Sequence, residues 1–82
     1  MNEIESTIMN TMLAKLREHD PSLGPDDLSR PIAELDLDSL ILIELHEQLE
    51  RTLQLKADLT KTAGFAFLDD FSTYFAKLAS QG

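Results

Sequence analysis

All three prolines of this 82-residue chain lie between residues 21 and 31, and together with Gly24 they prevent a continuous helix through that stretch. On both sides of it, apolar residues recur at the three- and four-residue spacing of helices that bury one face. No segment shows the alternating pattern of a β-strand. The chain is therefore predicted to be all-α, with a long loop after its first helix.

The first apolar repeat predicts a helix that ends near His19-Asp20-Pro21. Its apolar positions are Ile4, Ile8, Met9, Met12, Leu13 and Leu16. The loop that follows, residues 20–38, has apolar side chains of its own, and we expect these to pin it to the core. They are Leu23, Leu28, Ile32 and Leu35. Within the loop, Pro25-Asp26-Asp27-Leu28 favours a single helical turn, because proline suits the first position and acidic residues suit the first turn.

Two further helices are predicted, from about Ser39 to Leu53 and from Leu68 onward. Between them, residues 54–66 show little periodicity and predict a loop with at most a short helix over residues 57–61. We therefore expect a small four-helix bundle, with three main helices and a short third one, forming a single domain over residues 1–82. The aromatic residues near the C-terminus are expected to pack the core, with a pocket for a bound chain as the alternative. They are Phe65, Phe67, Phe71, Tyr74 and Phe75.

The composition restricts the partners that are expected. Seven basic and fifteen acidic side chains give a net charge of −8 at pH 7, which disfavours nucleic acid and anionic membranes and favours basic protein partners. The absence of cysteine excludes disulfides, thiolate catalysis and cysteine-based metal sites. The N-terminus lacks the apolar segment of a signal peptide, and no window is long enough to span a bilayer. We therefore expect a cytoplasmic protein that does not insert into membranes.

Ser39 is the leading candidate functional residue, because it lies where the proline-containing loop gives way to the second predicted helix. At a helix start, the free backbone N–H groups and the helix dipole both favour negative charge. A phosphate group esterified to this serine would therefore be stabilised. The alternative is that Asp38 and Ser39 serve only as capping residues.

A helix beginning at Ser39 has two different faces at about 100° per residue. The first is a core stripe that comprises Leu42, Leu45, His46, Leu49 and Leu53. The second lies beside Ser39, mixes apolar and charged side chains, and comprises Leu40, Ile43, Glu44, Glu47 and Arg51. We interpret this second face as a surface that contacts a partner; a solvated surface with two exposed aliphatic side chains is the alternative.

The catalytic and metal-binding motifs in this region are incomplete. The segment from His46 to Glu50 begins like the zinc-binding HExxH helix, but Glu50 replaces the second histidine and His46 lies on the core face. Acidic residues around Ser39 match three positions of a calcium loop, but Leu40-Ile41-Leu42 occupies positions that should be polar or glycine. No base is placed to activate Ser39. We expect neither a metal site nor enzymatic activity.

The motif Leu35-Asp36-Leu37-Asp38-Ser39-Leu40, followed by Ile43-Glu44-Leu45 and Leu49-Glu50, resembles the phosphopantetheine attachment region of acyl carrier proteins. The predicted order of helices and loop is similar over nearly the whole chain. The resemblance implies that a phosphopantetheinyl transferase attaches 4'-phosphopantetheine from coenzyme A to Ser39. It also implies a non-catalytic carrier, which presents an acyl thioester to enzymes of fatty-acid, polyketide or related specialised biosynthesis.

The same resemblance implies roles for the neighbouring residues. Asp38 would support the transferase and its metal, while Leu40, Glu44 and Glu47 would match the family's recognition helix. The physical character of this face agrees, since apolar side chains can anchor a contact while the acidic ones steer basic surfaces of acyl-loading and acyl-processing enzymes. Such contacts are expected to be weak and brief, and the carrier to be a monomer.

Three residues depart from the family's pattern. Asp36 replaces the usual glycine, so the loop there is not expected to need a glycine-only conformation. Arg51 interrupts an otherwise acidic helix surface, and His46 fits no familiar position. These departures favour a dedicated carrier in a specialised pathway over a housekeeping fatty-acid carrier.

Two alternatives to the acyl carrier stay open. One is an aminoacyl, peptidyl or D-alanyl carrier, although peptidyl-type carriers usually have glycine where this chain has Asp38. The other belongs to a different class: an acidic helical interaction module without a prosthetic group, in which Ser39 only caps the helix.

Overall fold

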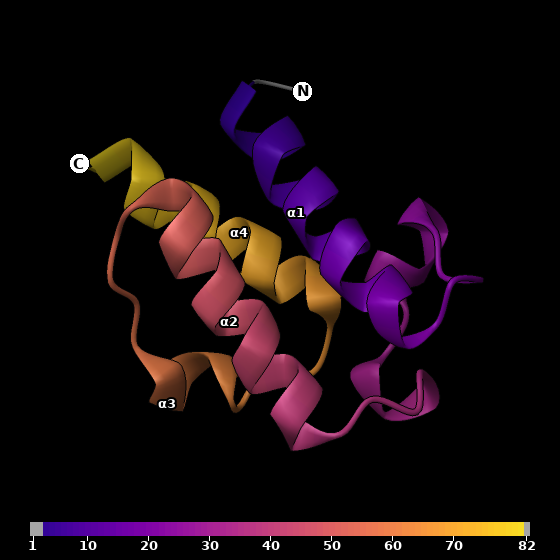
Figure 1. Cartoon of the computed structure of the whole chain (residues 1–82). Helices are drawn as coiled ribbons and strands as arrows, with labels where there is room; N and C mark the ends of the chain where they lie inside the picture. Colours follow the sequence, from indigo (N-terminus) through magenta and orange to yellow (C-terminus); the bar gives the residue numbers. More distant parts are fainter. Residues whose placement is uncertain (1–2, 82) are drawn as a thin grey trace.

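The computed structural model describes residues 3–81, which form four α-helices and two short 3-10 helices (Figure 1). In chain order these are α1 (Glu3–His19), η1 (Pro25–Ser29), η2 (Ile32–Glu34), α2 (Ser39–Leu53), α3 (Leu59–Thr62) and α4 (Leu68–Gln81). Residues 3–81 contain no β-strand, and the one isolated bridge among them joins Pro31 to Phe67. No helix in this part of the chain is long and apolar enough to cross a membrane. The predicted all-α bundle, with three main helices and a short third one, is confirmed.

The three long helices enclose the core. Figure 1 shows α1 and α2 in front of α4, and α1 packs against both of them. The buried apolar side chains of the helices are Ile8, Met12, Leu13, Leu16, Leu45, Leu49, Leu68, Phe71 and Phe75. They occupy the three- and four-residue positions of each predicted apolar face, so the helical pattern did indicate which side chains become buried.

The long loop between α1 and α2 packs against this core through its apolar side chains, as predicted. Its buried side chains are Leu23, Leu28, Ile32 and Leu35. Arg17 donates from Nε to the carbonyl oxygen of Leu23 at 2.7 Å, which ties the start of the loop to α1. Farther along, the backbone N–H of Ile32 donates to the carbonyl of Ala66 at 2.8 Å. The loop therefore links α1 to the segment before α4 and brings the chain to the start of α2.

The helical turn expected near Pro25 is present as η1. Gly24 precedes it, and its backbone N–H donates to Oδ2 of Asp27 at 2.9 Å. That hydrogen bond, together with one from Arg30 at 2.9 Å, holds the pKa of Asp27 below its usual range. The acidic residue thus stabilises the first turn of η1, where free N–H groups favour negative charge.

The aromatic side chains near the C-terminus pack mainly as core. Phe71 and Phe75 are fully buried, and they meet Phe65 and Tyr74 edge to face, with ring centroids 5.3 and 5.5 Å apart. This geometry is one of the favoured arrangements of aromatic pairs. Phe67 is the exception, with 40% of its surface exposed.

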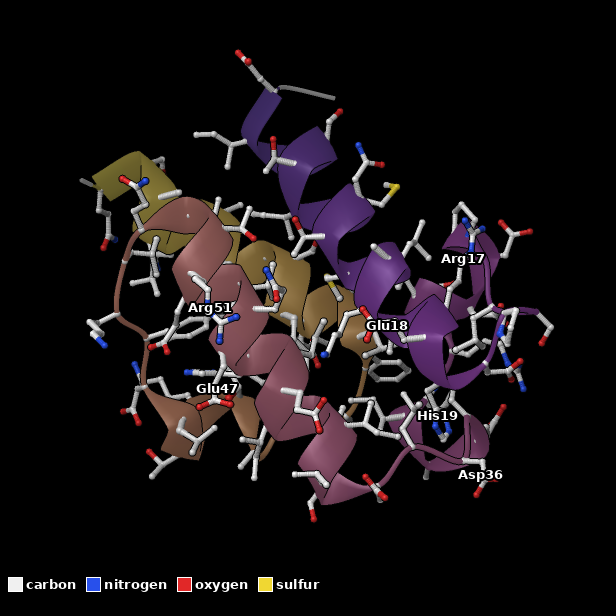
Figure 2. The ribbon with its side chains drawn as sticks, in the orientation of Figure 1. Arg17, Glu18, His19, Asp36, Glu47 and Arg51 are labelled. Atoms are coloured by element: carbon white, nitrogen blue, oxygen red, sulfur yellow. The ribbon has the colours of Figure 1, made fainter. Side chains whose placement is uncertain are left out.

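Asp36 does adopt a left-handed conformation, so the expectation that the loop would not need one there is wrong. Its φ is 55°, in the region that side chains with a Cβ rarely occupy. Aspartate is among the residues that reach this region at the smallest cost, because its short polar side chain can interact locally. Figure 2 shows Asp36 at the edge of the molecule, well away from Glu47 and Arg51. Aspartate can therefore replace glycine here while the loop keeps its turn.

The connection from α2 to α3 is anchored by Glu50. Helix α2 ends at Leu53, and Gln54 caps it with a left-handed φ of 56°. The carboxylate of Glu50 then accepts a hydrogen bond from the backbone N–H of Ala57 at 2.7 Å. That bond, with a smaller contribution from nearby His46, holds the pKa of Glu50 below its usual range.

The start of α3 differs from the sequence prediction by two residues. Asp58 caps the helix, because its side chain accepts a hydrogen bond from the N–H of Thr60 at 3.0 Å.

Glu50→Gln is expected to make the protein less sensitive to acid. Because the folded-state pKa of Glu50 is lowered, its carboxylate adds stability above the unfolded glutamate pKa of about 4.3, and this contribution disappears as the pH falls through the folded-state value. The variant should lose about 1 kcal/mol at pH 7 and progressively less as the pH falls below the unfolded pKa, as measured by urea unfolding across pH. Glu47→Gln, at an exposed position of the same helix, is the control. A constant difference between Glu50→Gln and wild type at all pH values would contradict this role.

Candidate functional site

Ser39 is the first residue of α2, and its side chain is exposed. The residue that caps the helix is Asp38, whose Oδ1 accepts a hydrogen bond from the N–H of Ile41 at 2.9 Å. Among residues 3–81, no group forms a hydrogen bond with the Ser39 hydroxyl. Within the described residues, Asp38 alone therefore caps α2 with its side chain, and the hydroxyl of Ser39 is free at the helix start.

The position of Ser39 suits a negatively charged substituent. Helix α2 is 15 residues long, and the free N–H groups and dipole of its first turn point toward the side where Ser39 lies. A phosphodiester on the serine oxygen would lie at this positive end of the helix and in contact with solvent. The residues around Ser39 therefore fit the attachment of a phosphate-linked group.

An apolar pocket of about 130 Å³ opens beside Ser39, between α2 and α3. It is lined by Ser39, Leu42, Ile43, Leu59, Thr62 and Ala63. Its volume is close to the roughly 150 Å³ of an engineered apolar cavity that binds benzene. The pocket can thus hold a small apolar group, or the first part of an apolar chain, next to the serine.

Three aliphatic side chains are exposed in this region: two that line the pocket, and Leu40, which follows Ser39 in the chain. Leu40 is 61% exposed and Ile43 37% exposed on α2, and Leu59 of α3 is 42% exposed. The first two lie on the face that the sequence predicted. Leu59 and the other α3 residues of the pocket were missed, because a single leucine in a short polar segment gives no periodic signal. The pattern that could have indicated Leu59 is the capping residue Asp58 directly before it.

On the face of α2 that is predicted to contact a partner, two charged residues are exposed and the third is half-buried and paired. Glu47 and Arg51 are exposed, and Figure 2 shows them one turn apart on the same side of α2. Glu44 is half-buried and pairs with Lys15 of α1, with Oε1 and Nζ 3.2 Å apart. The hydrogen bond from Lys15 to Glu44 raises the pKa of Lys15. Glu44 thus also joins α1 to α2, a contact that the sequence did not indicate.

His46 is buried, as its position on the core face predicted. Its ring packs edge to face against Phe75 of α4, and its two nitrogens lie within reach of Thr62 in α3 and Glu50 in α2. Within residues 3–81, no cluster of three or more histidine, aspartate or glutamate side chains could hold a metal ion.

A small helical bundle with a free serine at the start of its second long helix is the arrangement of a phosphopantetheine carrier. A family model described as "Phosphopantetheine attachment site" matches residues 6–75. The chain belongs to this family. Its members hold 4'-phosphopantetheine as a covalent prosthetic group, work with phosphopantetheinyl transferases and biosynthetic enzymes, and are generally non-catalytic.

A curated relative provides a second similarity. Fumosorinone synthetase from Cordyceps fumosorosea (strain ARSEF 2679) is 33% identical over 60 residues. The aligned region covers 73% of this chain and 1% of the relative, so the chain matches only a very small part of that protein. The comparison with solved structures gave no match.

Proposed function

We propose that residues 1–82 act as a single acyl carrier domain, in which 4'-phosphopantetheine is attached to Ser39 and holds an acyl intermediate as a thioester. The observation that carries this proposal is the free, exposed hydroxyl of Ser39 at the start of α2. The prosthetic group supplies a terminal thiol, which this cysteine-free chain lacks. The chain itself holds and presents the group, and its partner enzymes perform the chemistry.

Asp38 has a structural part in this proposal. Its side chain caps α2 and so fixes the backbone conformation next to the serine oxygen. An exposed carboxylate adjacent to the acceptor serine can also support the transferase and its bound metal. Both contributions would keep Ser39 accessible in one orientation during modification.

The apolar pocket favours an acyl cargo over an aminoacyl one. Four of its lining side chains are aliphatic: Leu42, Ile43, Leu59 and Ala63. An ammonium group placed among them would lose its hydration without gaining a charged partner. An acyl chain from fatty-acid, polyketide or related specialised biosynthesis is therefore the proposed cargo, and an aminoacyl, peptidyl or D-alanyl group is the alternative.

The exposed face around Leu40 supports a proposal about the partner enzymes. Leu40, Ile43 and Leu59 offer apolar anchors, while Glu47 would attract a basic side chain. Arg51 adds a positive charge to this face, so a matching partner would present an acidic group near its basic ones. The interface would be small and would release quickly, as suits a monomeric, cytoplasmic carrier that visits several enzymes.

The proposed function is tested by intact mass spectrometry. The apo chain is incubated with coenzyme A, magnesium and a broad-specificity phosphopantetheinyl transferase. A mass gain of one phosphopantetheine, located on the peptide that contains Ser39, is expected. A folded chain that gains no mass, or gains it on another residue, would contradict the proposal. Chains loaded from hexanoyl- or glycyl-coenzyme A then test the cargo, since only hexanoyl should shift the methyl resonances of Ile43 and Leu59.

Leu40→Ala is expected to lower kcat/KM for modification by the transferase about tenfold, because an exposed apolar anchor would be lost.

Glu47→Lys should slow association with basic partners and weaken the salt dependence of that association. The measurement is the initial rate of phosphopantetheine transfer at several ionic strengths. Asp26→Lys, at an exposed position of η1, is the control with the same change in charge. Equal effects of Glu47→Lys and Asp26→Lys would show that the transferase does not recognise the face that contains Glu47.

A further inference from the structure

His46 is a buried polar side chain that the proposed attachment chemistry does not use. It is 3% exposed, lies in α2 and packs edge to face against Phe75 of α4, with ring centroids 5.5 Å apart. Its Nδ1 lies 2.8 Å from Oγ1 of Thr62 in α3, and its Nε2 lies 3.3 Å from Oε2 of Glu50. Both ring nitrogens therefore have polar partners, and one of those partners belongs to α3.

The hydrogen-bond chain through Thr62 is complete in either of two proton arrangements. When Nε2 carries the ring proton it donates to Glu50, and the Thr62 hydroxyl donates to Nδ1. When both nitrogens are protonated, Nδ1 donates to Thr62, whose hydroxyl donates instead to the carbonyl oxygen of Leu59 at 3.2 Å. In residues 3–81 no buried side-chain nitrogen or oxygen lacks a hydrogen-bond partner. The two arrangements differ by one proton on Nδ1 and by a rotation of the Thr62 hydroxyl.

Helix α3 depends on such contacts, because four residues are too few to form a stable helix alone. Thr62 is its one buried residue. The segment before it is held by two further bonds, from the N–H of Ala57 to Glu50 and from the N–H of Asp58 to the hydroxyl of Tyr74 at 2.9 Å. In the described part of the chain, the His46–Thr62 bond is the only side-chain hydrogen bond that joins α2 directly to α3.

Thr62 also lines the apolar pocket beside Ser39, so the residue that binds His46 forms part of the pocket wall. We propose that His46 is a positioning residue, which fixes α3 against α2 through Thr62 and thereby holds the pocket beside Ser39 in shape. Loss of this bond would free α3 to move away from α2, and the wall formed by Leu59, Thr62 and Ala63 would move with it. The effect of His46 on a bound cargo rests on the proposed carrier function. Its effect on the position of α3 does not.

The test is amide hydrogen exchange of the apo chain carrying Thr62→Val, which keeps the side chain's shape but removes the hydroxyl. The amides of Thr62, Ala63 and Gly64 should lose roughly tenfold or more of their protection, while those in the middle of α1, α2 and α4 keep theirs. Thr11→Val is the matched control, because the Thr11 hydroxyl donates to the carbonyl of Thr7 at 2.7 Å within α1. A uniform loss of protection in all helices, or no loss in α3, would overturn the proposal.

Two substitutions of His46 provide a second test that separates its hydrogen bonds. Asparagine places an amide nitrogen at the position of Nδ1, whereas glutamine places one at the position of Nε2. His46→Asn should therefore retain more α3 protection than His46→Gln, although both remove the ring. The reverse order would show that Glu50, and not Thr62, is the partner through which His46 acts.

The consequence for cargo is measured on the loaded chain. Thr62→Val with a hexanoyl group should show faster cleavage of the thioester by hydroxylamine than Thr11→Val, because the cargo is less shielded. If wild type cannot be loaded, the proposed function fails while the exchange result still decides the role of His46. If loading succeeds but the α3 amides of Thr62→Val keep their protection, the positioning role alone is wrong.

Discussion

Replacing Ser39 with alanine is expected to abolish the phosphopantetheine mass gain completely while leaving the fold intact. The serine oxygen is the proposed attachment atom, so no modified product can form without it. Because the side chain is exposed and its hydroxyl has no partner within residues 3–81, the free energy of unfolding should change by less than about 0.5 kcal/mol. Intact mass and urea unfolding of wild type and variant, measured in parallel, test both parts.

Two matched variants control for this result. Ser29→Ala removes another exposed serine, one whose hydroxyl donates to the carbonyl of Asp26 at 3.0 Å, and this variant should still be fully modified. Asp38→Ala removes the cap of α2 and should cost about 1 kcal/mol of stability. If Ser39→Ala still gains mass, Ser39 is not the attachment residue. If it is as destabilising as Asp38→Ala, the hypothesis of a capping serine in an interaction module becomes the better one.

Phe71→Ala is expected to lower the free energy of unfolding by about 3–5 kcal/mol. The ring is fully buried in α4 and meets Phe65 edge to face, so its removal leaves a cavity and breaks an aromatic contact. An 82-residue domain typically has only about 4–12 kcal/mol of stability, so this loss is a large share of the total. Urea unfolding followed by far-ultraviolet circular dichroism measures it.

Phe67→Ala is the matched control for the core substitution. It removes the same side chain four residues earlier, where 40% of the surface is exposed, and should cost less than about 1 kcal/mol. Similar losses for both variants would contradict the packing of α4 described above.

The long helices and the core were predictable from the sequence, because the information for them is local. In α2, the residues expected on the core face include Leu45, His46 and Leu49, and all three are buried. In the loop, Leu28 and Ile32 were expected to face the core and do so. A buried face needs only apolar residues at helical spacing, which a single segment displays by itself.

The short elements and the turns were harder to predict. The four residues of α3 show no helical period, so the sequence prediction begins this helix two residues too early. In the structure the helix begins directly after its capping residue, Asp58. The left-handed conformation of Asp36 was also missed, because the identity of a residue limits its backbone angles without determining them. Here the path that the chain must take between η2 and α2 requires the turn.

The amino-acid sequence by itself determined which segments become helices, which faces they bury and which serine stands at the start of α2. These features depend on neighbours three or four residues away along the chain. Only the tertiary structure decided that Leu59 joins Ile43 at the pocket, that Lys15 pairs with Glu44 and that His46 binds Thr62. Those contacts join residues 16 to 29 positions apart, and they exist because helix packing brings separate segments together, which no local pattern encodes.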